Sequence, residues 1–247
     1  MNVAERMYVT FDFGGQNFLV TGASSGIGRA TAKELLASGA TVLGLARHFP
    51  AADELAAYAD RWQPRSVDVT DYAALSQAVD DFATGCGKFS GSVHAAGTAV
   101  LTPVNVWNHE QARAVTEVNV WAAGSLLKLM WKRKYHTDNF SHVFISSVSA
   151  HRGQKGLGVY GAGKAALEAL VRTAAQELSG KGQRVNSVCL GWIEHTGMTR
   201  DAETVVPTAP LGGGTVADAA GIILFLLSDR ARWITGANLV ADGGYLS

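Results

Sequence analysis

The stretch FLVTGASSGIG, residues 18–28, decides the fold of this 247-residue chain. Residues 18–20 form an apolar run that predicts a buried strand, and glycines at positions 22, 26 and 28 lead into a helical pattern over residues 29–38. Glycine permits positive φ, and the free N–H groups at a helix start attract phosphate. The stretch predicts a nucleotide-diphosphate site. For three glycines alone, a strand-to-helix turn without a ligand remains the alternative.

The composition favours a small-molecule partner. The chain has 21 basic and 21 acidic residues, so it lacks the positive charge that is typical of nucleic-acid binding. Its longest apolar run, residues 219–227, is too short to cross a bilayer, and the N-terminus lacks the apolar core of a signal peptide. Cys86 and Cys189 cannot build a disulfide framework, and no Cys/His spacing indicates a metal site. These features predict a cytoplasmic protein that binds no nucleic acid, membrane or metal.

Apolar strands alternate with helical windows along the rest of the chain, a pattern typical of a parallel sheet covered on both faces. We therefore expect an α/β fold, with residues 1–10 as a loosely held tail and residues 11–247 as a single Rossmann-like domain with a doubly wound sheet. The predicted strands cover residues 41–46, 66–69, 92–97, 142–146, 184–190 and 237–241. The predicted helices cover residues 71–84, 108–134, 160–179 and 215–228.

The predicted strand ends bring candidate site residues to one edge of the sheet. Ligands of such open sheets bind outside the carboxyl ends of the strands. Arg47, Asp68, residues 95–97, Ser147 and residues 191–193 all lie at or just past such an end. We expect these positions, far apart in sequence, to converge on one cleft.

Tyr160 and Lys164 stand four residues apart at the start of a helix, so they share one face. An ammonium group beside a phenol favours the phenolate, and a lowered pKa would let the tyrosine exchange protons near neutral pH. A Y-x-x-x-K spacing also occurs by chance, so the pair alone decides little.

Several motifs together resemble the short-chain dehydrogenase/reductase family. GASSGIG, DV at residues 68–69, AAG, VNV and the segment FISSVSAHRGQKGLGVYGAGKAAL occur in the family's order. The C-terminal part, from APLGGG to VADGGY, resembles the family's closing helix and strand. The resemblance covers residues 12–245 and implies a hydride-transferring enzyme.

The resemblance implies four catalytic residues: Asn119, Ser147, Tyr160 and Lys164. Tyr160 would be the general acid/base, Ser147 would hydrogen-bond the substrate oxygen, and Lys164 would lower the tyrosine pKa and bind the nicotinamide ribose. Asn119 would hold a water molecule beside Lys164, although a helix-interior asparagine can also serve nearby backbone. The implied cofactor-binding residues are Gly22, Ser24, Ser25, Gly26, Ile27, Gly28, Arg47, Asp68, Val69, Ala95, Gly97, Tyr160, Lys164, Ile193 and Thr196.

The chain departs from the family pattern at several positions. The usual NNAG is HAAG here, so His94 and Ala95 replace two asparagines, and the asparagine that normally steadies the middle of the sheet is absent. One extra residue in WIEHTGMT leaves open whether His195 or Thr196 reaches the carboxamide. Glycines at 161 and 163 weaken a helix interior, which suggests close packing against another subunit.

We expect NADP(H) to be preferred over NAD(H). In the dinucleotide fold an acidic residue after the second strand binds the adenosine ribose, but Ala46 occupies that position and Arg47 follows it. A guanidinium fork suits phosphate oxygens. Ser25 stands where many NADPH-using relatives have a second basic residue, so we expect a modest preference.

The expected reaction interconverts a secondary alcohol and a ketone, with a polyol, sugar, hydroxy acid or cyclic diol as substrate. The alternatives are a 3-oxoacyl-thioester (acyl-carrier-protein) reductase and a non-catalytic dinucleotide-binding module. His151, Arg152 and Lys155 in the loop after Ser147 match a hydroxyl-rich or anionic substrate, or are solvated charges.

The family's assemblies imply a homotetramer, or a homodimer, through the predicted helices 108–134 and 160–179. Trp121 and Trp131 are candidate interface anchors, with burial in the core of the same chain as the alternative.

Overall fold

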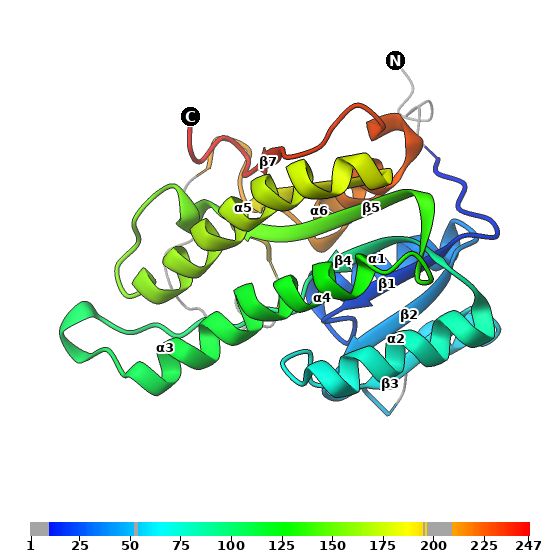
Figure 1. Cartoon of the computed structure of the whole chain (residues 1–247). Helices are drawn as coiled ribbons and strands as arrows, with labels where there is room; N and C mark the ends of the chain where they lie inside the picture. Colours follow the sequence, from blue (N-terminus) through cyan, green and yellow to red (C-terminus); the bar gives the residue numbers. More distant parts are fainter. Residues whose placement is uncertain (1–9, 52–53, 195, 197–208) are drawn as a thin grey trace, which may run out of the picture.

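Seven parallel strands form one sheet in the order β3-β2-β1-β4-β5-β6-β7, in a computed structural model that describes residues 10–51, 54–194, 196 and 209–247. Figure 1 shows the sheet with helices on both faces, so the predicted Rossmann-like, doubly wound α/β fold is confirmed. The strands are β1 (Asn17–Thr21), β2 (Thr41–Ala46), β3 (Trp62–Ser66), β4 (Phe89–His94), β5 (His136–Ser147), β6 (Gln183–Leu190) and β7 (Asn238–Ala241).

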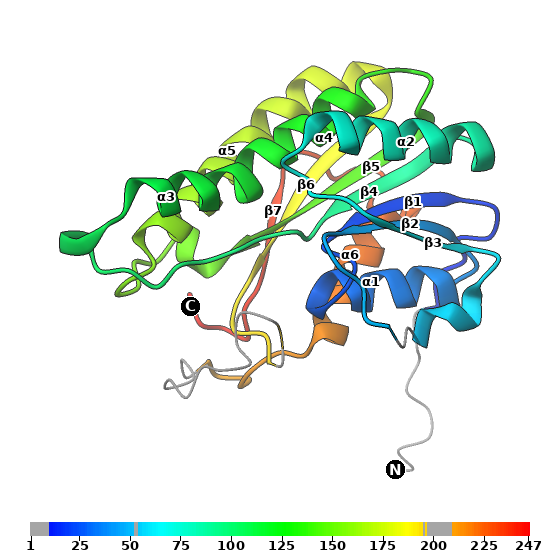
Figure 2. The same ribbon diagram turned by 90° about the horizontal axis from the view of Figure 1, so that it is seen from below.

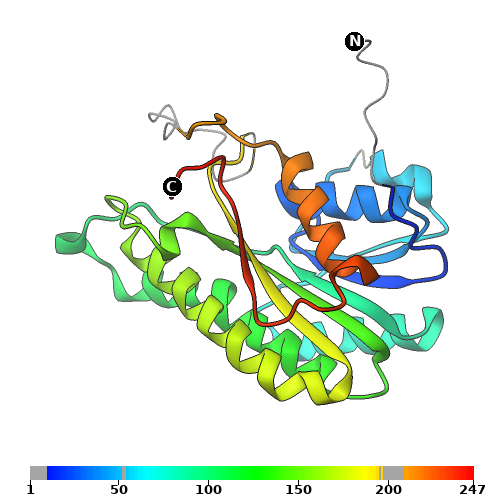
Figure 3. The same cartoon turned by 90° about the horizontal axis from the view of Figure 1, so that it is seen from above.

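The helices cover the sheet in two layers (Figure 2), with α1 and α6 on one face and α2, α4 and α5 on the other. Neighbouring residues of one strand serve opposite layers, because side chains alternate across a sheet. Phe18 and Val20 pack in the layer of α1 and α6, whereas Leu19 packs in the layer of α2 and α4. The helices are α1 (Gly26–Ala37), α2 (Tyr72–Cys86), α3 (His109–Thr116), α4 (Ala122–Met130), α5 (Gly158–Leu178) and α6 (Val216–Leu227). Figure 3 shows α6, in orange, beside α1, in blue.

Three predicted elements differ most from their expected bounds. The strand expected over residues 92–97 is β4, Phe89–His94, which begins and ends three residues earlier. The strand expected over residues 66–69 is β3, Trp62–Ser66, which ends where we expected it to begin. Its polar residues and Pro64 hide the strand pattern, and proline is tolerated there because β3 is an edge strand. The single helix expected over residues 108–134 is α3 and α4 joined by a π-helical turn, Glu117–Trp121, and it ends at Met130.

No helix in the described part of the chain is long and apolar enough to cross a membrane. The predicted tail falls almost wholly outside the described residues. The connection from β4 to α3 and α3 itself extend well past the sheet (Figures 1 and 2), and this region exposes the apolar side chains of Leu101, Val104, Val106 and Trp107.

Candidate active site

The glycine-rich turn leaves a helix N-terminus open. Gly22 and Gly26 have φ values of 68° and 52°, which favour glycine. A Cβ placed on Gly28 would lie 2.4 Å from the Gly22 carbonyl oxygen, so glycine at this position allows α1 to start close against β1. Ser25 caps α1 in an extended conformation, but its side chain makes no cap hydrogen bond. The N–H groups of the first turn therefore lack a side-chain cap and suit a phosphate group.

The ends of β2 and β3 place a cation and a carboxylate near each other. Arg47 and His48 are exposed directly after β2. Asp68 accepts hydrogen bonds from the Thr70 backbone N–H at 2.9 Å and from the Thr70 hydroxyl at 2.8 Å. These bonds, and the more distant charge of Arg47, hold the pKa of Asp68 below its usual value. The buried Val69 follows Asp68, so this edge combines the exposed Arg47 with a buried apolar residue.

Ser147, Tyr160 and Lys164 meet as predicted. Ser147 ends β5, and Tyr160 and Lys164 lie in the first two turns of α5. The Lys164 Nζ donates to the Ile145 carbonyl oxygen at 2.8 Å and lies 5.5 Å from the centre of the Tyr160 ring. All three side chains line one cavity of about 400 Å³.

The pKa of Tyr160 does not move in the predicted direction. Burial raises it, while a hydrogen bond with Ser147 opposes the rise. Burial also lowers the pKa of the Lys164 ammonium to about 8, because the low-dielectric interior disfavours its charged form. The prediction that the lysine lowers the tyrosine pKa is wrong for the protein alone, and the phenol stays protonated at neutral pH.

The cavity includes only part of the predicted set. Its predicted lining residues are Ile27, Ala95, Gly97, Ser147, Tyr160, Lys164, Ile193 and Thr196. Gly22, Ser24, Ser25, Gly26, Gly28, Arg47, Asp68 and Val69 lie on the glycine turn and the neighbouring strand ends, beyond the cavity lining. Thr196 lies beside Gly26, whereas His195 is outside the described residues. The predicted residues thus follow one edge of the sheet, from the end of β3 to Ser147, Tyr160 and Lys164.

Asn119 lies in the π-helical turn between α3 and α4, and it is fully buried. Its Oδ1 accepts from the Thr98 N–H at 3.2 Å, and its Nδ2 donates to the Thr98 carbonyl at 2.7 Å. The side chain serves nearby backbone, which was the alternative reading. It fixes the loop at Gly97, where a Cβ would lie 2.9 Å from the Asn119 Oδ1 and 3.6 Å from the Lys164 Nζ.

His94 forms hydrogen bonds that link neighbouring elements, at a position where the family usually has an asparagine. Its Nδ1 accepts from the Thr21 hydroxyl at 3.0 Å, and its Nε2 donates to the Val118 carbonyl at 3.1 Å. The Thr21 oxygen in turn accepts from the Ala96 N–H at 3.2 Å. His94 therefore ties the ends of β1 and β4 to the turn that carries Asn119.

The glycines of α5 serve packing within the chain. A Cβ on Gly161 would lie 2.5 Å from the Ser149 carbonyl oxygen, and one on Gly163 would lie 3.9 Å from the Asn119 Cβ. The suggestion that both glycines face another subunit is therefore wrong. The short turn after β5, Val148–Ala150, can sit directly on the start of α5 because Gly161 has no side chain.

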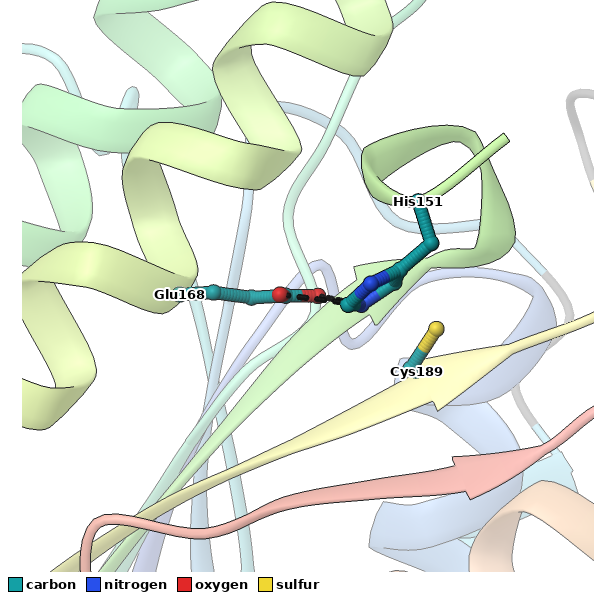
Figure 4. Close-up of side chains that lie close together, drawn as sticks. All are labelled: His151, Glu168 and Cys189. Atoms are coloured by element: carbon teal, nitrogen blue, oxygen red, sulfur yellow. Dashed lines mark hydrogen bonds and ion pairs between the residues drawn. The ribbon is translucent and has the colours of Figure 1, made fainter. Parts of the chain in front are cut away.

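His151 lies close to Glu168 of α5 and Cys189 of β6 (Figure 4). Its Nε2 lies 3.0 Å from the Glu168 carboxylate, which also accepts from the Ser146 hydroxyl at 2.5 Å. The Cys189 thiol is close by, and burial, together with the charges of Glu168 and Asp242, raises its pKa to about 12. His151, Glu168 and Cys189 are donor types that can bind a metal, and the fold brings them together from three separate elements, so sequence spacing could not reveal the group. The Glu168 carboxylate already contacts two protein groups, the Ser146 hydroxyl and the His151 ring. The expectation that this protein binds no metal stays a prediction.

Arg152 is also occupied within the protein. Its guanidinium stacks 4.7 Å from the centre of the Tyr245 ring and donates to the Tyr245 carbonyl at 3.3 Å. Of the three loop charges considered for substrate binding, Lys155 alone lines the described cavity.

Comparison with known proteins shows which family this sequence and fold belong to. Residues 22–246 match the family model described as enoyl-(acyl carrier protein) reductase. A 3-oxoacyl-[acyl-carrier-protein] reductase of Thermotoga maritima is 32% identical over 240 residues, which cover 93% of this chain and 97% of that protein. The chain belongs to the short-chain dehydrogenase/reductase family.

Two further comparisons extend over nearly the whole chain. The 2,3-dihydro-2,3-dihydroxybenzoate dehydrogenase of Escherichia coli is 31% identical and covers 94% of this chain and 98% of its own. A short-chain dehydrogenase/reductase structure from Brucella melitensis has a TM-score of 0.87 at 27% identity, covering 96% of this chain and 99% of its own. As a short-chain dehydrogenase/reductase, this protein is an NAD(P)-dependent oxidoreductase that acts on CH–OH groups.

Sequence reasoning missed Gln154, Asp242 and Tyr245, which also line the cavity. Trp192, another lining residue, lies just past the end of β6, within the strand-end positions 191–193 that we expected at the cleft. Asp242 and Tyr245 come from the segment after β7, where Asp242 accepts from the Gly244 and Leu246 N–H groups and folds the C-terminal residues toward the cavity.

Proposed function

We propose that this protein is an NADP(H)-dependent oxidoreductase that interconverts a secondary alcohol and a ketone, with Tyr160 as general acid/base. The observation that carries the proposal is the convergence of Ser147, Tyr160 and Lys164 on one cavity, at the same sheet edge as an uncapped, glycine-rich helix start. When bound, the nicotinamide cofactor supplies or accepts the hydride.

The sheet edge fits a dinucleotide along its length. Residues 22–28 would hold the pyrophosphate through the free N–H groups of α1, with Ser24, Ser25 and Ile27 beside it. Asp68 and Val69 would contact the adenine, Ala95 and Gly97 the middle of the cofactor, and Ile193 and Thr196 the carboxamide. These assignments rest on the family resemblance and on the positions of the residues along one edge.

Tyr160 is suited to act as the proton donor. Its pKa is raised, so the phenol holds its proton at neutral pH and can give it to a ketone oxygen during reduction. Ser147 hydrogen-bonds the same oxygen, where negative charge develops. Lys164 holds the ribose hydroxyls beside Tyr160 and stabilises the phenolate that forms.

Asn119 acts as a positioning residue in this proposal. Both polar atoms of its amide are bound to Thr98, so it fixes the backbone above Gly97. The resemblance implied that Asn119 holds a water molecule for Lys164, and the geometry supports a role through the loop instead.

Arg47 supports the preference for NADP(H). Its exposed guanidinium lies just past the end of β2, where the fold places the adenosine ribose. Asp68 is near enough to feel the charge of Arg47, but its carboxylate is already bound to Thr70. The guanidinium is thus left to pair with a 2′-phosphate, and NAD(H) remains a weaker cofactor.

A 3-oxoacyl-thioester reductase is the second candidate, and the Thermotoga maritima relative supports it. The Escherichia coli relative, whose name describes a cyclic vicinal diol, supports the first. A non-catalytic dinucleotide-binding module is the least supported reading, because Ser147, Tyr160 and Lys164 line one cavity.

We also propose a homotetramer, or a homodimer, in the cytoplasm. Trp121 and Trp131 are 59% and 46% exposed, so burial in the core of the same chain does not account for them. Lys181 covers part of Trp131, with its Nζ 4.1 Å from the ring centre, which leaves Trp121 as the better anchor. Cys86 and Cys189 are both free, which fits a reducing compartment.

The test compares Tyr160→Phe with Tyr72→Phe, a variant on the far helix α2. A substrate panel would contain sugars, polyols, cyclic diols and acetoacetyl thioesters. We expect Tyr160→Phe to abolish turnover while cofactor binding, followed by fluorescence titration, is retained. Turnover by Tyr160→Phe at the level of Tyr72→Phe would refute the assignment, and exclusive turnover of the thioester would establish the second candidate.

A further inference from the structure

Three polar side chains form a chain of hydrogen bonds on one wall of the cavity. The Ser147 hydroxyl lies 3.3 Å from the Ser149 hydroxyl, which donates to the Gln154 Oε1 at 2.5 Å. All three residues line the cavity, beside the apolar side chains of Val148 and Leu157. The polar groups thus continue along the cavity lining from Ser147 to Gln154.

Counting donors and acceptors shows what this chain can still bind. Ser147 Oγ accepts from the Ser149 N–H at 3.2 Å and donates to Ser149 Oγ, and Ser149 gives its hydrogen to Gln154. The Gln154 amide nitrogen carries two hydrogens. It donates to no group among the described residues, so it is free to donate to an oxygen in the cavity.

The position of Ser149 is fixed by the backbone around it. Ser149 lies in the short turn Val148–Ala150, and its carbonyl is so close to α5 that a Cβ on Gly161 would lie 2.5 Å from it. Groups held by packing lose little freedom when a ligand binds. The second hydroxyl is therefore presented next to the first at a set spacing.

We propose that Ser149 and Gln154 form a subsite for a second substrate oxygen, on the carbon next to the reacting one. The inference rests on the proposed function and names its substrate class: α-hydroxy ketones in reduction and vicinal diols in oxidation. The reacting oxygen binds between Ser147 and Tyr160 and takes the Ser147 hydrogen in place of Ser149 Oγ. The hydroxyl on the next carbon then donates to Ser149 Oγ, which keeps its own bond to Gln154 Oε1, and accepts from the Gln154 amide. In reduction, hydride forms the new C–H bond, the carbonyl π bond breaks, Tyr160 protonates the oxygen, and the cofactor is oxidised.

The spacing favours adjacent oxygens over those of a 3-oxoacyl group. The two serine hydroxyls are 3.3 Å apart, a separation that suits oxygens on neighbouring carbons. In a 3-oxoacyl thioester the second oxygen lies one carbon further away. A ketone without a second oxygen leaves the Gln154 amide without an acceptor, and sites built for a hydroxyl discriminate against such analogues.

The experiment uses three ketones that differ in the second oxygen: 3-hydroxy-2-butanone, 4-hydroxy-2-butanone and 2-butanone. With NADPH, we expect kcat/KM for 3-hydroxy-2-butanone to exceed that of both others by about tenfold or more. Ser149→Ala and Gln154→Ala should each reduce this ratio toward one. Ser149→Thr keeps the hydroxyl and should keep the ratio, and Gln176→Ala, an exposed change on α5, is the matched control.

The outcomes separate the two proposals. Equal kcat/KM values for the three ketones, or a ratio that survives both alanine substitutions, would overturn the subsite while leaving the proposed function intact. A higher kcat/KM for 4-hydroxy-2-butanone would also overturn it and favour the thioester reading. Turnover of no carbonyl compound, here or in the wider panel, would overturn both. Gln154→Glu, which keeps the acceptor for Ser149 but removes the amide donor, provides a second reading should Gln154→Ala fail to fold.

Discussion

Two buried histidines make the free energy of unfolding depend on pH below about 6.5, the ordinary histidine pKa. His94 bridges β1, β4 and the Asn119 turn, and His142 is fully buried on the interior strand β5. His142 accepts from the Ser92 hydroxyl at 2.8 Å and donates to the Gln183 Oε1 at 3.0 Å. Each ring thus uses one nitrogen as acceptor and one as donor, as a neutral imidazole does. Burial lowers the pKa of His94 to about 4 and that of His142 to about 3.

The sign follows from where the protons bind. Above pH 6.5, the ordinary histidine pKa, both rings are neutral in the folded and the unfolded chain. Below pH 6.5 the two histidines bind protons in the unfolded chain but stay neutral in the folded chain. The folded state therefore loses stability as the pH falls. At pH 5 each histidine is about 1.5 units below its unfolded pKa, which costs about 2 kcal/mol. Together the pair should remove about 4 kcal/mol between pH 7.5 and pH 5.

Urea denaturation at pH 7.5, 6 and 5 measures this loss. His94→Asn, which restores the residue type that the family usually has, should remove about half of the pH dependence, whatever it does to stability at pH 7.5. His109→Gln, at the exposed start of α3, should leave the dependence unchanged. A free energy of unfolding that stays flat from pH 7.5 to 5, or an unchanged slope in His94→Asn, would show that these rings are not held neutral by the fold.

Three further predictions concern the cofactor, Glu168 and the assembly. Arg47→Ala should weaken NADPH binding about ten- to a hundredfold and leave NADH binding nearly unchanged, and equal weakening in titrations of both would contradict the assignment. Glu168→Leu should lower the free energy of unfolding by about 1–3 kcal/mol, because the buried Ser146 hydroxyl loses its acceptor. The control Glu177→Leu, at an exposed position, should change it by about 0.5 kcal/mol or less. Similar values for the two variants in urea denaturation would argue against a stabilising bond between Ser146 and Glu168. Sedimentation should show a tetramer or dimer that Trp121→Glu dissociates, and a wild-type monomer at micromolar concentration would exclude the interface.

Local patterns predicted the sheet well where strands are buried and apolar. The run at 18–20 and the strand at 41–46 are recognisable because both faces of these strands are covered. β3 was displaced because an edge strand needs fewer apolar residues and tolerates Pro64. The π-helical turn was missed because its residues keep a helical apolar spacing, so only the hydrogen-bond pattern distinguishes it.

The site was predictable where a residue type serves the chemistry directly, and not where the fold supplies a partner. Ser147, Tyr160 and Lys164 carry their spacing in the sequence. The raised pKa of Tyr160 depends on burial, and the roles of His94, Glu168 and Gln154 depend on neighbours that are distant in the chain. Because those contacts are made across elements, no local window contains them.

Because the Ser25 side chain does not cap α1, a bound dinucleotide would stabilise the start of this helix. An α-helix start whose N-cap side chain makes no hydrogen bond leaves N–H groups that a bound ligand can satisfy. A bound pyrophosphate would supply the missing acceptor and join β1, the glycine turn and α1 into one unit. Slower deuterium exchange of the first-turn amides and a higher unfolding temperature should then accompany occupancy, rising with the logarithm of dinucleotide concentration. The free energy of unfolding of the enzyme is thereby linked to the concentration of its nicotinamide cofactor.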